Sequence, residues 1–320
     1  MNKLSKYTYA PNDNKHMVQY GLWSNCCNNC AFCLIQDKHV YSKDEMIFWI
    51  NMTRQNLRHI DWKNKFAYGV STLGGELFFV KDKEIQDAYM RLIDDIIDLV
   101  LIPCKETARF SFVTNGLYEP SFLYRAVDRV VERVGIQFVD ANFSYDLKYR
   151  YKNENAKQLA IKNINAFAMR YNYDVGVQMI LTQNVIDLWK QGLFDVNDHM
   201  SAHFVKGNLC FLYPHPIETG IKLEDFNFKR KDFLKFMLYL KERNPRIYSD
   251  FTNSTLNSAT FKYSGLDLKD PNMPVDFQPI LSAGKEVIQE KCGHSTLYNC
   301  YSDSDKCVLC DLQLLDASLR

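Results

Sequence analysis

The chain has 320 residues, of which 47% are hydrophobic and 24% are charged, the composition of a globular protein with a sizeable core. Its 39 Lys and Arg residues nearly balance its 38 Asp and Glu residues, and the formal net charge of +1 excludes a bulk field that would attract nucleic acid. Residues 1–15 are polar, and nowhere do about 18 apolar residues run without interruption, so we expect no membrane partner and a cytoplasmic location.

Strand-like and helix-like segments alternate along the first three quarters of the chain. Strand-like runs are expected at residues 17–23, 66–72, 109–114, 136–144, 175–181 and 202–213. Apolar side chains at helical spacing predict helices at residues 44–60, 85–100, 121–133, 156–170, 186–194 and 232–243. Regular alternation of this kind predicts an α/β fold with parallel strands and crossover helices, either a barrel or an open barrel. Residues 244–282, rich in Asn, Ser, Pro and Asp, are expected to be irregular.

Three cysteines lie on one short loop after the first strand-like run. Cys26, Cys30 and Cys33 have the spacing C-x3-C-x2-C, with Phe32 directly before the last of them. Thiolate is the preferred ligand of iron-sulfur clusters, and a compact loop can reach three corners of one four-iron cluster. The fourth iron would then be open to a small molecule that carries an amine and a carboxylate. A structural zinc site is the alternative, although zinc takes four ligands, often from two C-x2-C pairs.

A second motif, Gly74-Gly75-Glu76, follows the second strand-like run. Glycine lets the backbone approach a ligand closely, and a carboxylate can accept hydrogen bonds from an ammonium group. The alternative is an ordinary glycine turn with a solvated Glu.

Together, the cysteine spacing and the Gly-Gly-Glu motif resemble the radical SAM superfamily, in which a [4Fe-4S] cluster binds S-adenosylmethionine (SAM). The resemblance covers residues 17–243 and implies a partial (β/α)6 barrel with its chemistry at the carboxyl ends of the strands. It also implies an oxidoreductase or maturase-like enzyme that cleaves SAM reductively to a 5'-deoxyadenosyl radical, which abstracts hydrogen from a substrate. An electron donor such as flavodoxin or ferredoxin would supply the electron. Leu77 replaces the proline that commonly follows the motif in the family.

The resemblance further implies a set of cofactor-binding residues. Gly74, Gly75 and Glu76 would hold the amino group of SAM, while the ribose, carboxylate and adenine would contact residues that follow the later strands. These are Asn115, Ser144, Asp146 and Ile180, with Asn184 close to the last of them. Each could instead belong to ordinary turn chemistry. Lys148 and Arg150 would either pair with the SAM carboxylate or lie at the surface. His199, His203 and His215 could serve a substrate, although isolated histidines are more often structural.

Four further cysteines near the C-terminus indicate a second metal site. They are Cys292, Cys300, Cys307 and Cys310, and the last two form a C-x2-C pair. An auxiliary iron-sulfur cluster would resemble the SPASM and twitch extensions of radical SAM enzymes. The alternative is a zinc ion held by the four cysteines, or with His294 in place of one of them. We expect two domains, a barrel at residues 1–245 and an irregular extension at 246–320. The remaining cysteines, Cys27, Cys104 and Cys210, are expected to be ordinary thiols.

The substrate is the least defined feature of the sequence. The cysteine-rich extension resembles those of maturase enzymes and favours a peptide or protein residue. A nucleotide or nucleic-acid base is the second hypothesis, because Tyr145, Tyr149 and Tyr151 alternate with cations over residues 145–152 and could stack on bases. A non-catalytic binding protein stabilised by metal is the third.

Overall fold

Six parallel strands form one sheet in the order β1-β2-β3-β4-β5-β6. The computed structural model describes residues 16–28, 30, 32–33, 39–60, 62, 67–104, 107–213, 226–260, 301–304 and 308–317. The strands are β1 (His16–Gly21), β2 (Ala67–Leu73), β3 (Arg109–Thr114), β4 (Val139–Tyr145), β5 (Val175–Ile180) and β6 (Gly207–Leu212). Parallel strands that follow one another in chain order and are joined by helices have the topology of an α/β barrel. In the described residues β1 pairs with β2 alone and β6 with β5 alone, so the barrel is not closed. The sheet is therefore an open, partial barrel of the predicted α/β class.

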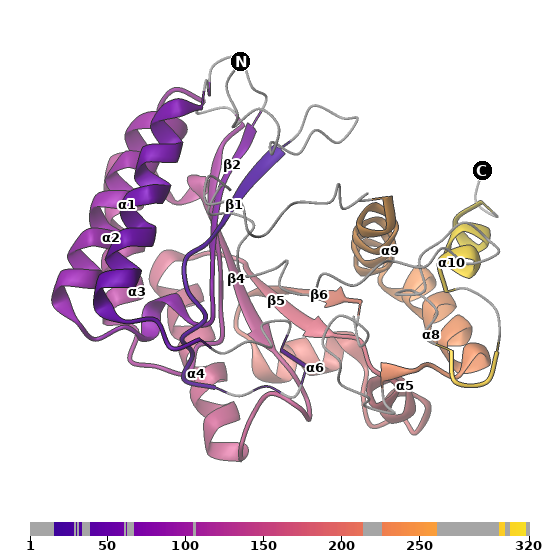
Figure 1. Ribbon diagram of the computed structural model, residues 1–320. Helices are drawn as coiled ribbons and strands as arrows, with labels where there is room; N and C mark the ends of the chain where they lie inside the picture. Colours follow the sequence, from indigo (N-terminus) through magenta and orange to yellow (C-terminus); the bar gives the residue numbers. More distant parts are fainter. Residues whose placement is uncertain are drawn as a thin grey trace.

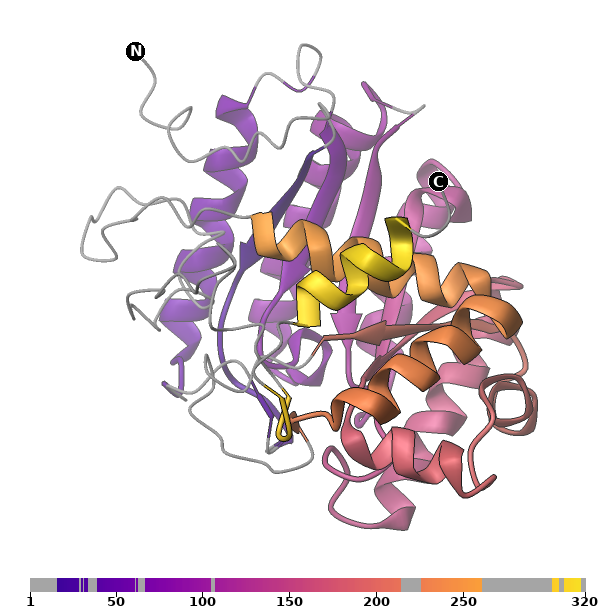
Figure 2. The ribbon, with the colours of Figure 1, turned by 90° about the vertical axis from the view of Figure 1, so that its right-hand side faces the viewer.

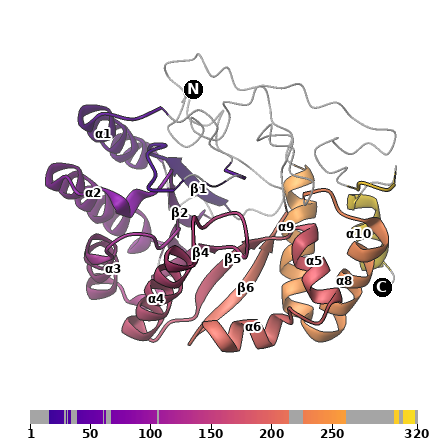
Figure 3. The same ribbon diagram turned by 90° about the horizontal axis from the view of Figure 1, so that it is seen from below.

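Helices cover the outer side of the curved sheet (Figures 1 and 3). The helices of the described residues are α1 (Lys43–His59), α2 (Lys83–Ile96), α3 (Ser121–Arg133), α4 (Glu154–Tyr171), α5 (Gln183–Lys190), α6 (Val196–His203), α8 (Arg230–Arg243), α9 (Pro245–Thr260) and α10 (Val308–Ala317), of which α10 packs on other helices and not on the sheet. Shorter turns occur at Leu77–Phe79, Ile97–Leu101 and Ile136–Phe138. No helix among the described residues is long and apolar enough to cross a membrane.

Alternation along the strands sets the two faces of the sheet. In β4 every second residue from Val139 to Tyr145 is buried, and the residues between them are half-exposed. The buried set faces the helices, as shown by Phe143, whose ring centroid lies 5.3 Å from that of Phe167 in α4. The half-exposed set, which includes Asn142 and Ser144, therefore lies on the inner face of the sheet.

Side-chain caps explain where several helices begin. Ser42 and Glu45 form a capping box at the start of α1. The side chains of Asn153 and Thr182 cap α4 and α5 by accepting a hydrogen bond from a backbone N–H three residues on. Asp195 caps α6, a helix that the sequence did not predict. The expected strand at residues 202–213 is consequently wrong over its first part, because residues up to His203 belong to α6 and β6 begins at Gly207.

The prediction of irregular chain after residue 243 is wrong for residues 245–260, which form α9. This helix lies beside β6 (Figure 3), where the ring of Phe251 lies 6.3 Å from that of Tyr213. Farther along the chain, α10 is held to α8 by Asp311, whose carboxylate accepts two 2.8 Å hydrogen bonds from Arg230 and one of 2.9 Å from Tyr301. Figure 2 shows α10, in yellow, crossing α9, which it also contacts. The proposed domain boundary at residue 245 stays a prediction.

Candidate metal and cofactor site

The cysteine loop and the Gly-Gly-Glu segment form one hydrogen-bonded unit. Beyond the β1–β2 pairing, Leu22 N donates to Leu73 O at 3.0 Å, Gly75 N to Trp23 O at 2.8 Å, and Glu76 N to Asn25 O at 2.8 Å. A Cβ on Gly75 would lie 2.3 Å from the carbonyl oxygens of Ser24 and Asn25, so only glycine permits this approach. The second glycine of the motif is thus required by the adjacent cysteine loop.

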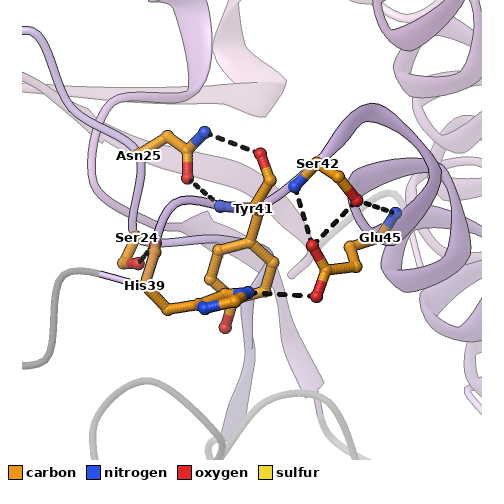
Figure 4. Close-up of polar contacts among 6 residues, drawn as sticks. All are labelled: Ser24, Asn25, His39, Tyr41, Ser42 and Glu45. Carbon is orange, nitrogen blue, oxygen red and sulfur yellow. Dashed lines mark hydrogen bonds and ion pairs between the residues drawn. The ribbon is translucent and has the colours of Figure 1, made fainter.

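The two ends of the cysteine loop are tied together by side chains (Figure 4). Asn25 Nδ2 donates to Tyr41 O at 3.0 Å, and Tyr41 N donates to Asn25 Oδ1 at 2.7 Å. Ser24 Oγ donates to His39 O at 2.6 Å. Helix α1 begins directly afterwards, at the capping box of Ser42 and Glu45. These contacts close the loop around the three cysteines, and the sequence motif gave no sign of them.

Nitrogen donors surround the thiols of this loop. Cys26 is exposed, Cys30 and Cys33 are half-buried, and all three carry thiols rather than disulfides. Asn28 N lies 3.4 Å from Cys26 Sγ, and Asn28 Nδ2 lies 3.3 Å from Cys30 Sγ. Asn115 follows the end of β3, and its Nδ2 lies 3.6 Å from Cys26 Sγ. N–H groups directed at sulfur are typical surroundings of thiolate ligands.

Within the described residues, no three Cys, His, Asp or Glu side chains are arranged to hold a metal ion. A single zinc or iron ion would need its thiolates about 2.3 Å from one centre. A four-iron cluster separates its ligands more widely, because each cysteine binds a different iron. Three thiols on one loop, with N–H groups directed at two of them, have the donor chemistry of an iron-sulfur cluster site.

Glu76 carries a buried carboxylate that is 2% exposed. Thr114 Oγ1 and Asn115 N donate to it at 2.9 and 2.7 Å, and Phe78 N donates at 3.3 Å. Burial raises the pKa of Glu76 to about 8, and the nearby Cys26 thiol adds to this rise, whereas the three hydrogen bonds oppose it. Among the described residues, no Lys, Arg or His forms an ion pair with Glu76. An ammonium group of a ligand would supply the missing cation.

The end of β3 reaches both motifs. Asn115 contacts Glu76 through its backbone N–H and lies 3.6 and 3.5 Å from the sulfurs of Cys26 and Cys27 through its side-chain amide. The pKa of Cys27 is raised by a hydrogen bond with Cys26 and by burial, although Asn115 opposes the rise. Asn115 therefore contacts two thiols of the loop. Its predicted contact with the ribose or carboxylate of SAM stays a prediction.

Of the residues predicted from the later strands, Ser144 and Ile180 are half-exposed at the ends of β4 and β5. Asp146 is instead buried and accepts hydrogen bonds from Lys148 N at 2.8 Å and Tyr149 N at 2.5 Å. Burial raises the pKa of Asp146, and these backbone donors oppose the rise. These hydrogen bonds to the Asp146 carboxylate stabilise the turn after β4. Arg150 follows this turn and lies beside the cysteine loop.

Tyr145 and the histidines of α6 contact one another on the helix side of the sheet. Tyr145 is fully buried, and its hydroxyl lies 3.1 Å from His199 Nε2 in α6. The rings of His199 and His203 are 4.5 Å apart, and burial lowers the pKa of His199 to about 4, with His203 as a second cause. Tyr145 is therefore not available to stack on a base. His215 lies outside the described residues.

The predicted second metal site falls mostly outside the described residues as well. Cys292, Cys300 and Cys307 are not described, and of Cys310 only its place in α10 is known. The neighbouring residues Tyr301 and Asp311 are anchored to α8, as described above. The second metal site stays a prediction.

Fold and site together define the class as an open α/β barrel with a thiol-rich loop after its first strand. No protein-family model matches the chain, and no curated protein matches it. Among solved structures, spore photoproduct lyase complexed with dinucleoside spore photoproduct is similar, with 13% sequence identity and a TM-score of 0.33. The match covers 70% of this chain and 59% of that one, so the chain spans less than two thirds of the length of that enzyme.

Proposed function

We propose that this chain is a radical SAM enzyme. The observation that carries the proposal is a hydrogen-bonded unit: Trp23 and Asn25, which directly precede the Cys26 to Cys33 loop, accept hydrogen bonds from the backbone N–H groups of Gly75 and Glu76. Each motif alone occurs by chance in unrelated proteins. The cysteine motif and the Gly-Gly-Glu motif both belong to SAM binding at a cluster, and their contact in space is much less expected by chance than either motif alone.

Cys26, Cys30 and Cys33 would hold a [4Fe-4S] cluster, and SAM would bind at its fourth iron. When both are bound, the cluster delivers an electron from a donor such as flavodoxin or ferredoxin, and SAM yields a 5'-deoxyadenosyl radical that abstracts hydrogen from the substrate. The chain itself supplies orientation and shelter from water. Glu76 would accept the ammonium group of SAM, which supplies the cation that its buried carboxylate lacks.

Ser144 and Ile180 would lie along the nucleoside of SAM, on the half-exposed inner face of β4 and β5. Ser144 is in register with Gln178, and Gln178 with Cys210 of β6. This row is polar and carries no Asp, Glu, Lys or Arg, so it suits an uncharged group that forms hydrogen bonds.

The leading substrate hypothesis is a peptide or protein residue, because the side-chain amide of Gln178 in this row can pair with a peptide backbone. A nucleotide or nucleic-acid base is the second candidate, although it now lacks Tyr145 as a stacking surface. The C-terminal cysteines would hold an auxiliary cluster or a zinc ion. A non-catalytic protein stabilised by metal is the remaining alternative.

Anaerobic reconstitution with iron and sulfide tests the proposal. The wild type should bind about four irons per chain, or about eight if the C-terminal cysteines hold a second cluster. Its reduced electron paramagnetic resonance (EPR) signal should change when SAM is added, and 5'-deoxyadenosine should form with dithionite. Replacement of Cys26, Cys30 and Cys33 by Ala should remove about four irons and all SAM cleavage.

The matched control is Cys104→Ser, since this thiol donates to Trp62 O at 3.2 Å, away from the loop, and a hydroxyl can keep that bond. The control should keep the iron content and SAM cleavage of the wild type. SAM cleavage retained by the triple variant would end the proposal, and so would a wild type that binds zinc and no iron.

A further inference from the structure

The loop after β4 contacts the cysteine loop through Arg150. Arg150 Nη1 lies 3.6 Å from Cys30 Sγ, and its Cζ lies 5.0 Å from the centroid of the Phe32 ring. Stacking of the planar guanidinium on an aromatic ring fixes its direction, which a flexible surface arginine would not have. One side chain therefore touches both a cysteine of the motif and the aromatic residue before its last cysteine.

Asn28 completes the contact from the other side. Its Nδ2 donates to Arg150 O at 2.7 Å and lies 3.3 Å from Cys30 Sγ. Cys30 thus receives an N–H group from its own loop and another from a segment 120 residues away in sequence. Because the same amide also binds the backbone of Arg150, the two donors hold each other in place.

The charge of Arg150 is directed at the thiols. Its Nε is buried and has no hydrogen-bond partner among the described residues, and none of the ion pairs in that part of the chain includes Arg150. Asp146, the nearest acidic group that acts on both Arg150 and Cys30, accepts backbone N–H groups of its own turn. The guanidinium is therefore only partly neutralised beside Cys30.

We propose that Arg150 and Asn28 are positioning residues that raise the reduction potential of the cluster bound by Cys30. Reduction adds a negative charge to a cluster, and a nearby cation with N–H groups directed at the ligand sulfur stabilises that charge. The effect is large where water is excluded, because screening is weak there. The inference rests on the proposed function, and it adds a role for two residues that hold no iron.

The test is a redox titration of the reconstituted protein, followed by EPR without SAM, with iron counted in every sample. Arg150→Met should lower the midpoint potential, and Arg150→Gln, which keeps N–H donors but no charge, should lower it by a smaller amount. Lys152→Met is the matched control, since it removes an exposed cation two residues away. It should leave the potential unchanged, because solvent screens an exposed charge.

Equal potentials for the wild type and Arg150→Met at equal iron content would overturn the inference. So would an unchanged potential in Arg150→Met together with a weaker EPR change when SAM is added in a separate measurement, because Arg150 would then act on SAM. If Arg150→Met does not hold iron, Arg150→Gln and Asn28→Ala decide the matter: a lowered potential in either supports the inference, and unchanged potentials in both refute it. A wild type that binds no cluster would refute the proposed function, and this inference with it.

Discussion

Gly75→Ala should loosen the junction between the two motifs. The new methyl group would lie 2.3 Å from the carbonyl oxygens of both Ser24 and Asn25, and these are backbone atoms that cannot turn away. The two segments must therefore move apart. Gly75 does not have a positive φ, so the cost arises from the close approach alone.

The size of the effect follows from these contacts. Overpacking of a tight site costs about 1 to 3 kcal/mol. Separation of the segments also weakens the two 2.8 Å hydrogen bonds, from Gly75 N to Trp23 O and from Glu76 N to Asn25 O. Each backbone hydrogen bond contributes about 1 kcal/mol, so we expect a loss of about 3 kcal/mol in the free energy of unfolding.

Urea unfolding of the cluster-free protein, followed by circular dichroism, measures this loss. Gly192→Ala is the control, because nothing lies within 4 Å of its Cβ position while its φ is +70°. It should cost about 1 kcal/mol through backbone strain alone. If Gly75→Ala is no more destabilising than Gly192→Ala, the close approach is not rigid and the proposed junction between the motifs fails.

Two further predictions concern buried carboxylates. The pKa of Glu76 is raised to about 8, so the folded cluster-free protein binds a proton that the unfolded chain has released, and its stability should fall as pH rises from about 4.5 to about 8. Glu76→Gln should flatten this part of the curve of urea midpoint against pH, and parallel curves would contradict it. Asp311→Ala removes the partner of Arg230 and Tyr301, so the free energy of opening of α10 should fall by about 1 to 3 kcal/mol and its amide hydrogens should exchange faster. Unchanged exchange would show that apolar packing alone holds α10.

The barrel could be predicted from sequence because its strands and outer helices have strong periodicity. Helix α9 could not, because its buried side chains, among those that the structure describes, are Tyr248, Phe251, Thr252 and Thr255, and two threonines give no apolar stripe. Helix α6 is short, and its apolar positions are too few to outweigh the strand-like run that follows. The capping residue Asp195 was the available signal for this helix.

The parts of the site that are formed by residues close in sequence could be predicted, and those that depend on tertiary contacts could not. The cysteines and the Gly-Gly-Glu segment were identified from a few adjacent residues. The contact of Arg150 with Cys30 spans 120 residues, and that of Asn115 with Cys26 spans 89, so no local pattern reports either. The hydrogen bonds that Asp146 accepts from Lys148 N and Tyr149 N could not be foreseen from the residue type either, and its contact with SAM stays a prediction.

The contacts divide the strand ends into two groups. The segments after β1, β2, β3 and β4 meet around the thiols, through Gly75, Asn115 and Arg150. By contrast, Gln178 of β5 and Cys210 of β6 lie in register on the inner face, and no described contact joins them to the cysteine loop. A cluster and the methionine part of SAM would occupy the first group, and the nucleoside would extend along Ser144 and Ile180. This leaves Gln178 and Cys210 for the group that is to be modified. Substitution of Gln178 should then change which substrate reacts without changing the iron content, whereas changes around Cys30 alter the cluster itself.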